Sequence, residues 1–226
     1  MAYDHEEQEQ LDSLKAFWNQ YGNLLTWVLI IVLGAYAGYN YWRYMQRNKA
    51  EAASMVYDQL QKSAQAADNA KVQKVAADLE SKYDSTVYAP MGALVAARSA
   101  FDANDNKTAK AQLQWAADHG SDEIKAIARL RIAGILLDEK AYDEGLKLLG
   151  GEFLPQFSSA VADRKGDILA AQNKLDEARK SYIVALAGMN KSDPGRKLVE
   201  VKLEAIGGTV PAKPADPAAP AAPAAA

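Results

Sequence analysis

The stretch that decides the fold is residues 163–186, DRKGDILAAQNKLDEARKSYIVAL. Small and large side chains follow one another there in a fixed order, at offsets of three, twelve, sixteen and nineteen from the first: Gly166, Leu169, Ala178, Tyr182 and Ala185. Small residues let the two helices of a hairpin cross closely, and large residues fill the space between hairpins. The stretch therefore predicts a helical hairpin. Because one such hairpin cannot bury its own apolar face, it also predicts a stack of hairpins.

The same order of side chains recurs upstream. It returns 33 residues earlier at Ala133, Leu136, Gly145 and Leu149, and 36 residues before those at Ala97, Ala109, Leu113 and Ala116. A period of about 34 residues is that of the tetratricopeptide repeat, a unit of two helices joined by a turn. The consensus tryptophan and most of the glycines are missing, so we expect degenerate repeats. An Ala-rich helical bundle is the alternative.

The remaining pattern is helical throughout. No segment alternates in the manner of a strand rich in Val, Ile and Thr. We expect an all-α fold, a right-handed solenoid of tetratricopeptide-like hairpins over residues 43–208, in which the first hairpin, 50–83, matches poorly and acts as a cap. Asp193 and Pro194 predict the capped start of the last helix. The first helices of the other hairpins are expected at 90–103, 123–138 and 160–172.

An uncharged run of 27 residues separates Lys15 from Arg43. Within it, residues 24–42 approach the length of about 20 residues that a helix needs to cross a bilayer. Trp and Tyr gather at both ends of the run, as in the aromatic belts of membrane interfaces. We therefore predict one transmembrane helix at 24–42. Neither Gly nor Pro occurs between Gly38 and Pro90, so this helix is expected to continue into the soluble domain.

The residues leave two properties of this span open. Cleavage near Ala37 would release a soluble secreted repeat protein, although the tail before the span, residues 1–23, is acidic where a signal peptide is positive. Basic residues are more numerous after the span than before it, which by the positive-inside rule places the repeats in the cytoplasm, but the rule weakens before a long domain. Gly34 and Gly38 form a G-x-x-x-G face that lets another membrane helix pack closely, and the alternative is a chance occurrence, because glycine is common in membrane helices.

Composition and motifs exclude several classes of function. A net charge of −3 gives no reason to expect nucleic acid, and the absence of cysteine removes disulfides, thiolate metal sites and a cysteine nucleophile. His5 and His119 are too far apart in the chain to suggest a metal site, and no phosphate-binding loop or nucleophile motif occurs. We expect no catalysis, metal, cofactor or small-molecule substrate. The Pro/Ala-rich residues 209–226 predict a disordered tail.

Protein binding is the function that stacked hairpins favour. The first helix of each hairpin lines the concave face, where we expect a groove for a segment of a partner protein. Plain core packing is the alternative for its apolar members. The candidate groove residues are Met91, Leu94, Arg98 and Phe101 from the first of these helices, Arg129 from the second, and Asp163 and Asp167 from the third.

The protein resembles the YfgM family, the ancillary subunits of the SecYEG translocon, in the order of its parts. It also resembles that family in three segments: LKAFWNQYGN at 14–23, YNYWRYMQ at 39–46 and DEIKAIARLRIA at 122–133. The resemblance covers residues 1–208. Because no catalytic motif defines the family, it rests on architecture and on these segments.

The resemblance implies a location and partners. It places the chain in a bacterial inner membrane as a single-pass protein, with the N-terminus in the cytoplasm and the repeats in the periplasm, against the charge count at the span. It implies association with the SecYEG translocon and with a membrane-anchored periplasmic chaperone of the PpiD type. The implied role is to help pass newly exported proteins to periplasmic chaperones. A scaffold for another envelope complex is the alternative that the residues leave open.

Overall fold

The structure is a computed structural model that describes the backbone of residues 3–210 and the side chains of residues 14–210. Within this range every regular element is a helix and no strand occurs, which confirms the all-α fold class. The chain forms two compact units, which divide between Ala52 and Ala53. The tail predicted at 209–226 lies outside the described residues from residue 211 onward, as do the side chains of residues 1–13 in the acidic tail.

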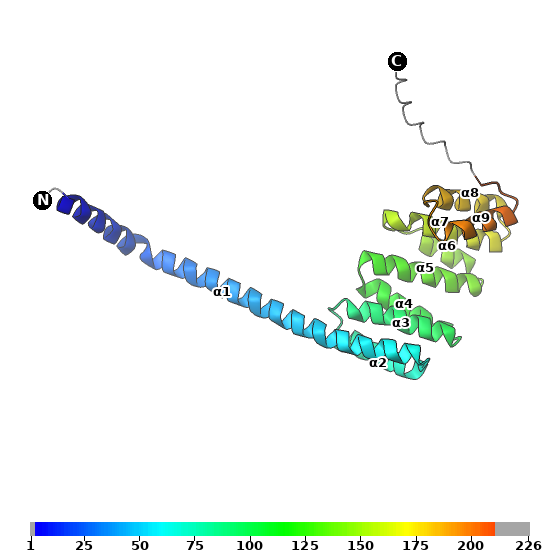
Figure 1. The fold of residues 1–226 in the computed structure, drawn as a ribbon, viewed down its shortest axis with the longest axis horizontal. Helices are drawn as coiled ribbons and strands as arrows, with labels where there is room; N and C mark the ends of the chain where they lie inside the picture. Colours follow the sequence, from blue (N-terminus) through cyan, green and yellow to red (C-terminus); the bar gives the residue numbers. More distant parts are fainter. Residues whose placement is uncertain (1–2, 211–226) are drawn as a thin grey trace, which may run out of the picture. The chain divides into compact units, whose positions relative to one another are not determined.

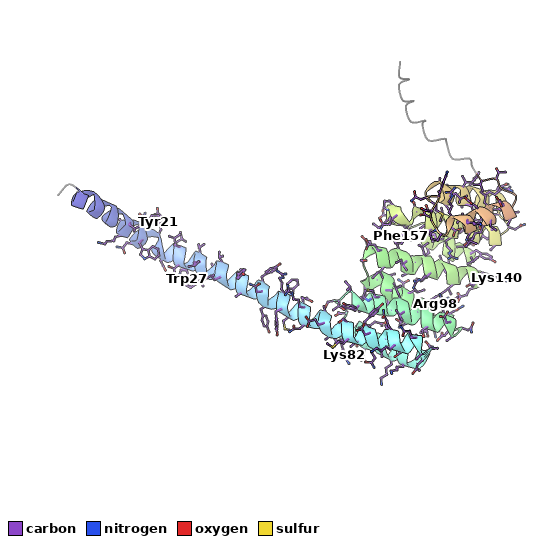
Figure 2. The ribbon with its side chains drawn as sticks, in the orientation of Figure 1. Tyr21, Trp27, Lys82, Arg98, Lys140 and Phe157 are labelled. Carbon is purple, nitrogen blue, oxygen red and sulfur yellow. The ribbon has the colours of Figure 1, made fainter. Side chains whose placement is uncertain are left out.

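The first unit belongs to helix α1, Tyr3–Gln65, which continues without a break into the second unit. In the first unit its large apolar side chains are exposed, among them Trp27 at 60% and Ile31 at 66%. Figure 2 labels Trp27 on this part of the helix. Among the described residues, α1 is the one helix that is long and apolar enough to cross a membrane by length and composition. An exposed apolar run of this size is unfavourable in water, so it indicates a surface that a bilayer covers.

The second unit is a series of helical hairpins that follow one another in chain order (Figure 1). Residues 53–65 of α1 and helix α2 make the first. Each later hairpin pairs an odd-numbered helix with the next even-numbered one, and the odd-numbered helices begin and end within two residues of the predicted bounds. The helices are α2 (Asn69–Lys82), α3 (Tyr88–Asp102), α4 (Asn106–His119), α5 (Asp122–Asp138), α6 (Tyr142–Leu149), α7 (Ser158–Ala171) and α8 (Leu175–Ala187), with the short 3-10 helix η1 (Pro155–Phe157) before α7 and helix α9 (Arg196–Ala205) at the end.

One turn geometry joins the two helices in all four hairpins. A residue with positive φ follows the end of each first helix. The amide of the residue after it donates to the carbonyl five residues back, as from Asp105 to Ala100 at 2.9 Å and from Lys174 to Leu169 at 2.9 Å. This is the C-terminal motif that satisfies the free carbonyls of a helix end. The first hairpin has the same turn, although its sequence matches the repeat poorly. The residues with positive φ are Ala67, Asn104, Lys140 and Asn173.

The small and large positions of the repeat form the cores of the hairpins. An added Cβ at Gly166 would lie 2.5 Å from the ring of Tyr182, so the glycine is what allows α7 and α8 to approach at this point. A close approach also occurs between successive hairpins, where an added Cβ at Gly145 of α6 would lie 2.8 Å from Ile168 of α7. All residues of the predicted repeat pattern are buried: Ala97, Ala109, Leu113, Ala116, Ala133, Leu136, Gly145, Leu149, Gly166, Leu169, Ala178, Tyr182 and Ala185.

Helix α9 covers the last hairpin. Its buried residues Val199 and Leu203 join the core cluster of α7 and α8. The start of α9 differs from the sequence prediction, because the helix begins at Arg196 with Gly195 as its N-cap residue. The carboxylate of Asp193 instead accepts a hydrogen bond from the amide of Asn190 at 2.7 Å, inside the preceding loop. Asp and Pro favour turns as well as helix starts, and here the turn prevails.

Candidate functional site

The first helices of successive hairpins line a hollow of about 590 Å³ on one face of the second unit. Met91, Leu94 and Arg98, three of the residues predicted for the groove, lie along α3 and line this hollow. Tyr57 of α1 and Arg131 of α5 line it from either side. The hollow therefore spans three first helices, and Met91 remains 37% exposed within it.

A second hollow, of about 320 Å³, adjoins the first. Arg98 and Arg131 line both, so these two side chains lie at the boundary between the hollows. Phe101, another predicted groove residue, lines the second hollow and is 39% exposed. Arg164 of α7 lines it as well. We call the two hollows together the inner groove.

Three arginines from successive first helices meet in the inner groove. Arg131 and Arg164 stand two residues before the repeat positions Ala133 and Gly166, with the repeat spacing of 33 residues. Arg98 lies about one helical turn further along the equivalent face of α3. Sequence reasoning selected Arg98 and missed the other two. Their 33-residue spacing is the signal that could have identified them.

The three guanidinium groups differ in their partners. Arg98 pairs with Asp102 at 2.8 Å, one turn along its own helix, and Arg164 pairs with Asp167 at 3.6 Å. Arg131 has no ion pair or hydrogen bond with any residue that the structure describes. Partial burial, and to a smaller extent the positive charge of Arg98, lowers the pKa of Arg131. The centre of the groove thus holds a cation that forms no ion pair with the described residues.

Asp163 and Asp167, predicted as groove residues, do not line these hollows with Met91 and Phe101. Their carboxylates bind Lys202 of α9, whose Nζ lies 2.9 Å from Asp163 and 2.8 Å from Asp167. Asp167 also accepts a hydrogen bond from the hydroxyl of Tyr182 at 3.0 Å. Burial raises the pKa of Asp163 and, together with the charge of Asp167, that of Tyr182. These acids therefore fasten α9 to the last hairpin.

Arg129 also lies apart from the inner groove. It lines a separate hollow of about 430 Å³ with the loop that follows α6, and its guanidinium donates to the carbonyl of Glu152 at 3.4 Å. Although Arg129 and Arg131 are only two residues apart, that separation turns them to different faces of α5. The arginine that enters the groove is therefore Arg131.

Gly34 and Gly38 belong to the first unit. An added Cβ at either glycine would meet nothing within 4 Å, so both leave their face of α1 open for another helix to approach. At Gly22, by contrast, an added Cβ would lie 3.2 Å from the ring of Trp18. The packing of a partner helix on Gly34 and Gly38 stays a prediction.

Comparison with known proteins identifies the family. The model of the tetratricopeptide repeat-like domain family matches residues 15–208. The ancillary SecYEG translocon subunit of Neisseria gonorrhoeae is 32% identical over 208 residues, which cover 91% of this chain and 100% of that protein. This chain belongs to the ancillary SecYEG translocon subunit family. The family members of Haemophilus influenzae and Escherichia coli are each 29% identical, over 80% and 78% of this chain and 92% and 85% of their own lengths. No solved structure matches the chain significantly.

Family membership bears on the sequence predictions. It confirms the resemblance to the YfgM family, and the match to the repeat-like domain favours tetratricopeptide-like hairpins over a generic Ala-rich bundle. The names of the relatives describe ancillary subunits of the SecYEG translocon. The family and the exposed apolar part of α1 together indicate a membrane-anchored protein.

Proposed function

We propose that this protein is a membrane-anchored, protein-binding scaffold at the Sec translocon that helps pass newly exported proteins to periplasmic chaperones. In this proposal the N-terminus is cytoplasmic, residues 24–42 span the inner membrane, and the repeats at 43–208 face the periplasm. A chaperone of the PpiD type is a partner in the membrane. The protein binds other proteins and converts no substrate.

The observation that carries the proposal is the inner groove. At about 590 Å³ its larger hollow falls in the range of sites that hold a ligand or several side chains. Its walls combine exposed apolar side chains, Met91 and Phe101, with the cation of Arg131. Such a mixture suits a peptide segment, which offers apolar side chains and polar groups together. The names of the relatives support the translocon as the place where the groove acts.

Site-specific photocrosslinking in living cells tests the groove. A photoreactive amino acid in place of Leu94 is expected to form adducts with translocon components, a membrane-anchored chaperone and exported chains. The matched control places the same amino acid at Lys180, which is exposed on α8 and lines none of the hollows described above. Equal adducts at Leu94 and Lys180, or none at Leu94 in cells that accumulate the full chain, would refute a role for the groove.

Protease protection tests the anchor and the topology together. In inside-out vesicles of the inner membrane the repeats are expected to resist added protease, and in spheroplasts they are expected to be digested. An epitope tag at the N-terminus is expected to show the opposite pattern. Digestion of the repeats in inside-out vesicles would place them in the cytoplasm and would remove the role with periplasmic chaperones.

Substitution of the small residues in the span tests helix packing. Gly34→Ile with Gly38→Ile covers the face on which a second helix is expected to approach. The double variant is expected to stay in the membrane while co-purifying with less of its translocon or chaperone partner. Ile31→Val, on an exposed position of the same span, is the control. Unchanged co-purification of the glycine variant would contradict packing at these residues.

A further inference from the structure

The three arginines of the inner groove are a feature that hairpin packing does not require. Arg98, Arg131 and Arg164 come from α3, α5 and α7, and all three line the same 320 Å³ hollow. The guanidinium of Arg164 reaches across to α5, because an added Cβ at Gly134 would lie 3.6 Å from it. Three successive hairpins thus place one guanidinium each along a single face.

The charges along this face are available to a ligand. Arg131 has no partner among the described residues, and its side chain is exposed. The pair between Arg98 and Asp102 has side chains that are 73% and 53% exposed. Pairs of this kind contribute little to stability, so Arg98 can exchange Asp102 for another carboxylate at small cost. Arg164 is bound to Asp167 only at 3.6 Å, while Asp167 has Lys202 as its closer partner.

We propose that the inner groove binds an extended acidic peptide segment of a partner protein, whose carboxylate is held by Arg131 between Arg98 and Arg164. An apolar side chain of the same segment enters the larger hollow beside Met91 and Leu94. Guanidinium and carboxylate groups match in shape and can form two parallel hydrogen bonds, which is why arginine suits this contact better than lysine. The inference rests on the proposed function, because it names the chemistry of the segment that the groove takes.

The same groove disfavours a dense polyanion. Asp102 lines the larger hollow and Asp138 lines the smaller one, so carboxylates alternate with the arginines. A nucleic acid or a sheet of phosphate headgroups would bring negative charge against these acids at close spacing. A peptide with a few separated carboxylates avoids that repulsion, and it also fills the apolar walls. The complementary ligand is therefore a peptide with separated acidic residues and at least one large apolar residue.

Fluorescence anisotropy of the full chain in neutral detergent micelles tests the proposal. The probe is a labelled peptide with two glutamates flanking a leucine, and its control is the same peptide with glutamines. The acidic probe is expected to bind and the amide control to bind at least about tenfold more weakly, since a charge-assisted contact is lost. Because exposed charges are screened, raising the salt from about 0.1 M to about 1 M is also expected to weaken binding.

Variants of the protein locate the contact. Arg131→Gln is expected to weaken binding of the acidic probe about tenfold, and Arg131→Lys by less, because lysine keeps the charge but loses the paired hydrogen bonds. Lys180→Gln removes the same charge from the outer helix α8 and is expected to change nothing. Circular dichroism of each variant verifies that the helices are retained, and only variants with the helical signal of the parent chain are compared.

Several results would overturn the inference. These are equal binding of the acidic and amide peptides, full affinity in Arg131→Gln, an equal loss in Lys180→Gln, or tighter binding of a short labelled oligonucleotide than of the acidic peptide. Co-purification with SecYEG, measured in parallel, separates this inference from the proposed function. A chain that co-purifies with the translocon but ignores the acidic peptide refutes the inference alone, whereas loss of co-purification from the parent chain refutes the proposed function.

Discussion

Replacement of Gly166 by alanine tests whether close helix crossing holds the last hairpin together. The new Cβ would lie 2.5 Å from one ring carbon of Tyr182, 2.6 Å from a second and 3.0 Å from a third. Tyr182 is 3% exposed, and its hydroxyl is tied to Asp167 at 3.0 Å. The ring therefore cannot swing aside, and α7 and α8 must separate to admit the methyl group.

The two contributions to the free energy of unfolding have opposite signs. Overpacking of a core costs about 1–3 kcal/mol, and exchanging glycine for alanine inside a helix returns about 1 kcal/mol. The expected net loss for Gly166→Ala is therefore up to about 2 kcal/mol. For a domain of this size such a loss lowers the melting temperature by up to roughly 8 °C.

Gly134→Ala is the matched control, because it makes the same chemical change in α5 without the clash. The nearest atoms to its new Cβ are those of the Arg164 guanidinium at 3.6–3.9 Å, an ordinary contact with the end of a flexible side chain. Alanine there is expected to stabilise the fold by about 0.4–1 kcal/mol. Thermal unfolding of the full chain, followed by circular dichroism in detergent, measures both variants.

A melting temperature for Gly166→Ala equal to or above that of Gly134→Ala would refute this reasoning. A double variant identifies the contact itself. When Tyr182→Leu removes the ring, adding Gly166→Ala should no longer destabilise the hairpin, so the two changes are expected to be non-additive. Additive losses would show that the alanine acts elsewhere.

Three further predictions concern the acidic cluster, the membrane span and a helix cap. Burial raises the pKa of Asp163 above its ordinary 3.8. The protonated carboxyl therefore contributes to the free energy of unfolding below pH 3.8, and this contribution is lost as the pH rises through the raised pKa. Asp163→Asn is expected to flatten that loss in urea titrations carried out at a series of pH values. Leu29→Arg with Ile30→Arg raises the free energy of membrane insertion by about 5–7 kcal/mol. Alkaline extraction is therefore expected to release this double variant from membranes. Asp105→Ala removes the cap of α4 and is expected to cost about 1 kcal/mol on thermal unfolding, whereas Asp193→Ala, which caps no helix, costs less.

The period of the repeats could be predicted because burial constrains it. At the crossing of two helices only a small residue fits, as Gly145 and Gly166 show, so the order of small and large residues predicts the packing. The conformation of the turns is harder to predict from the sequence. Asn104 and Asn173 suit a positive φ, but Ala67 and Lys140 adopt the same conformation without a sequence signal. At these two positions the turn is held by backbone hydrogen bonds, from Asp68 to Ser63 at 3.1 Å and from Ala141 to Leu136 at 2.8 Å.

The roles of Asp163 and Asp167 could not be predicted from their helix alone. Both face the side on which a first helix lines the groove in the other hairpins, so a groove position was the expected one. The partner that decides their role is Lys202, which lies in α9, 35 residues beyond Asp167. Pairing over such a distance depends on how the terminal helix docks, through Val199 and Leu203, and not on local spacing. A hairpin pattern read one repeat at a time does not contain that information.

Arg131 and Arg164 were missed for a different reason. They recur with the period of the repeat, but they do not occupy the buried small and large positions that define it. Stacking requires small residues at Ala133 and Gly166, since those positions are buried between helices. It places no such requirement on a side chain two residues earlier, which points into the open groove. Packing therefore does not explain why arginine recurs there at Arg131 and Arg164 with the period of the repeat. An exposed charge that recurs with the structural period places cations at regular intervals along one face, and binding separated charges of opposite sign is the physical use of such a face.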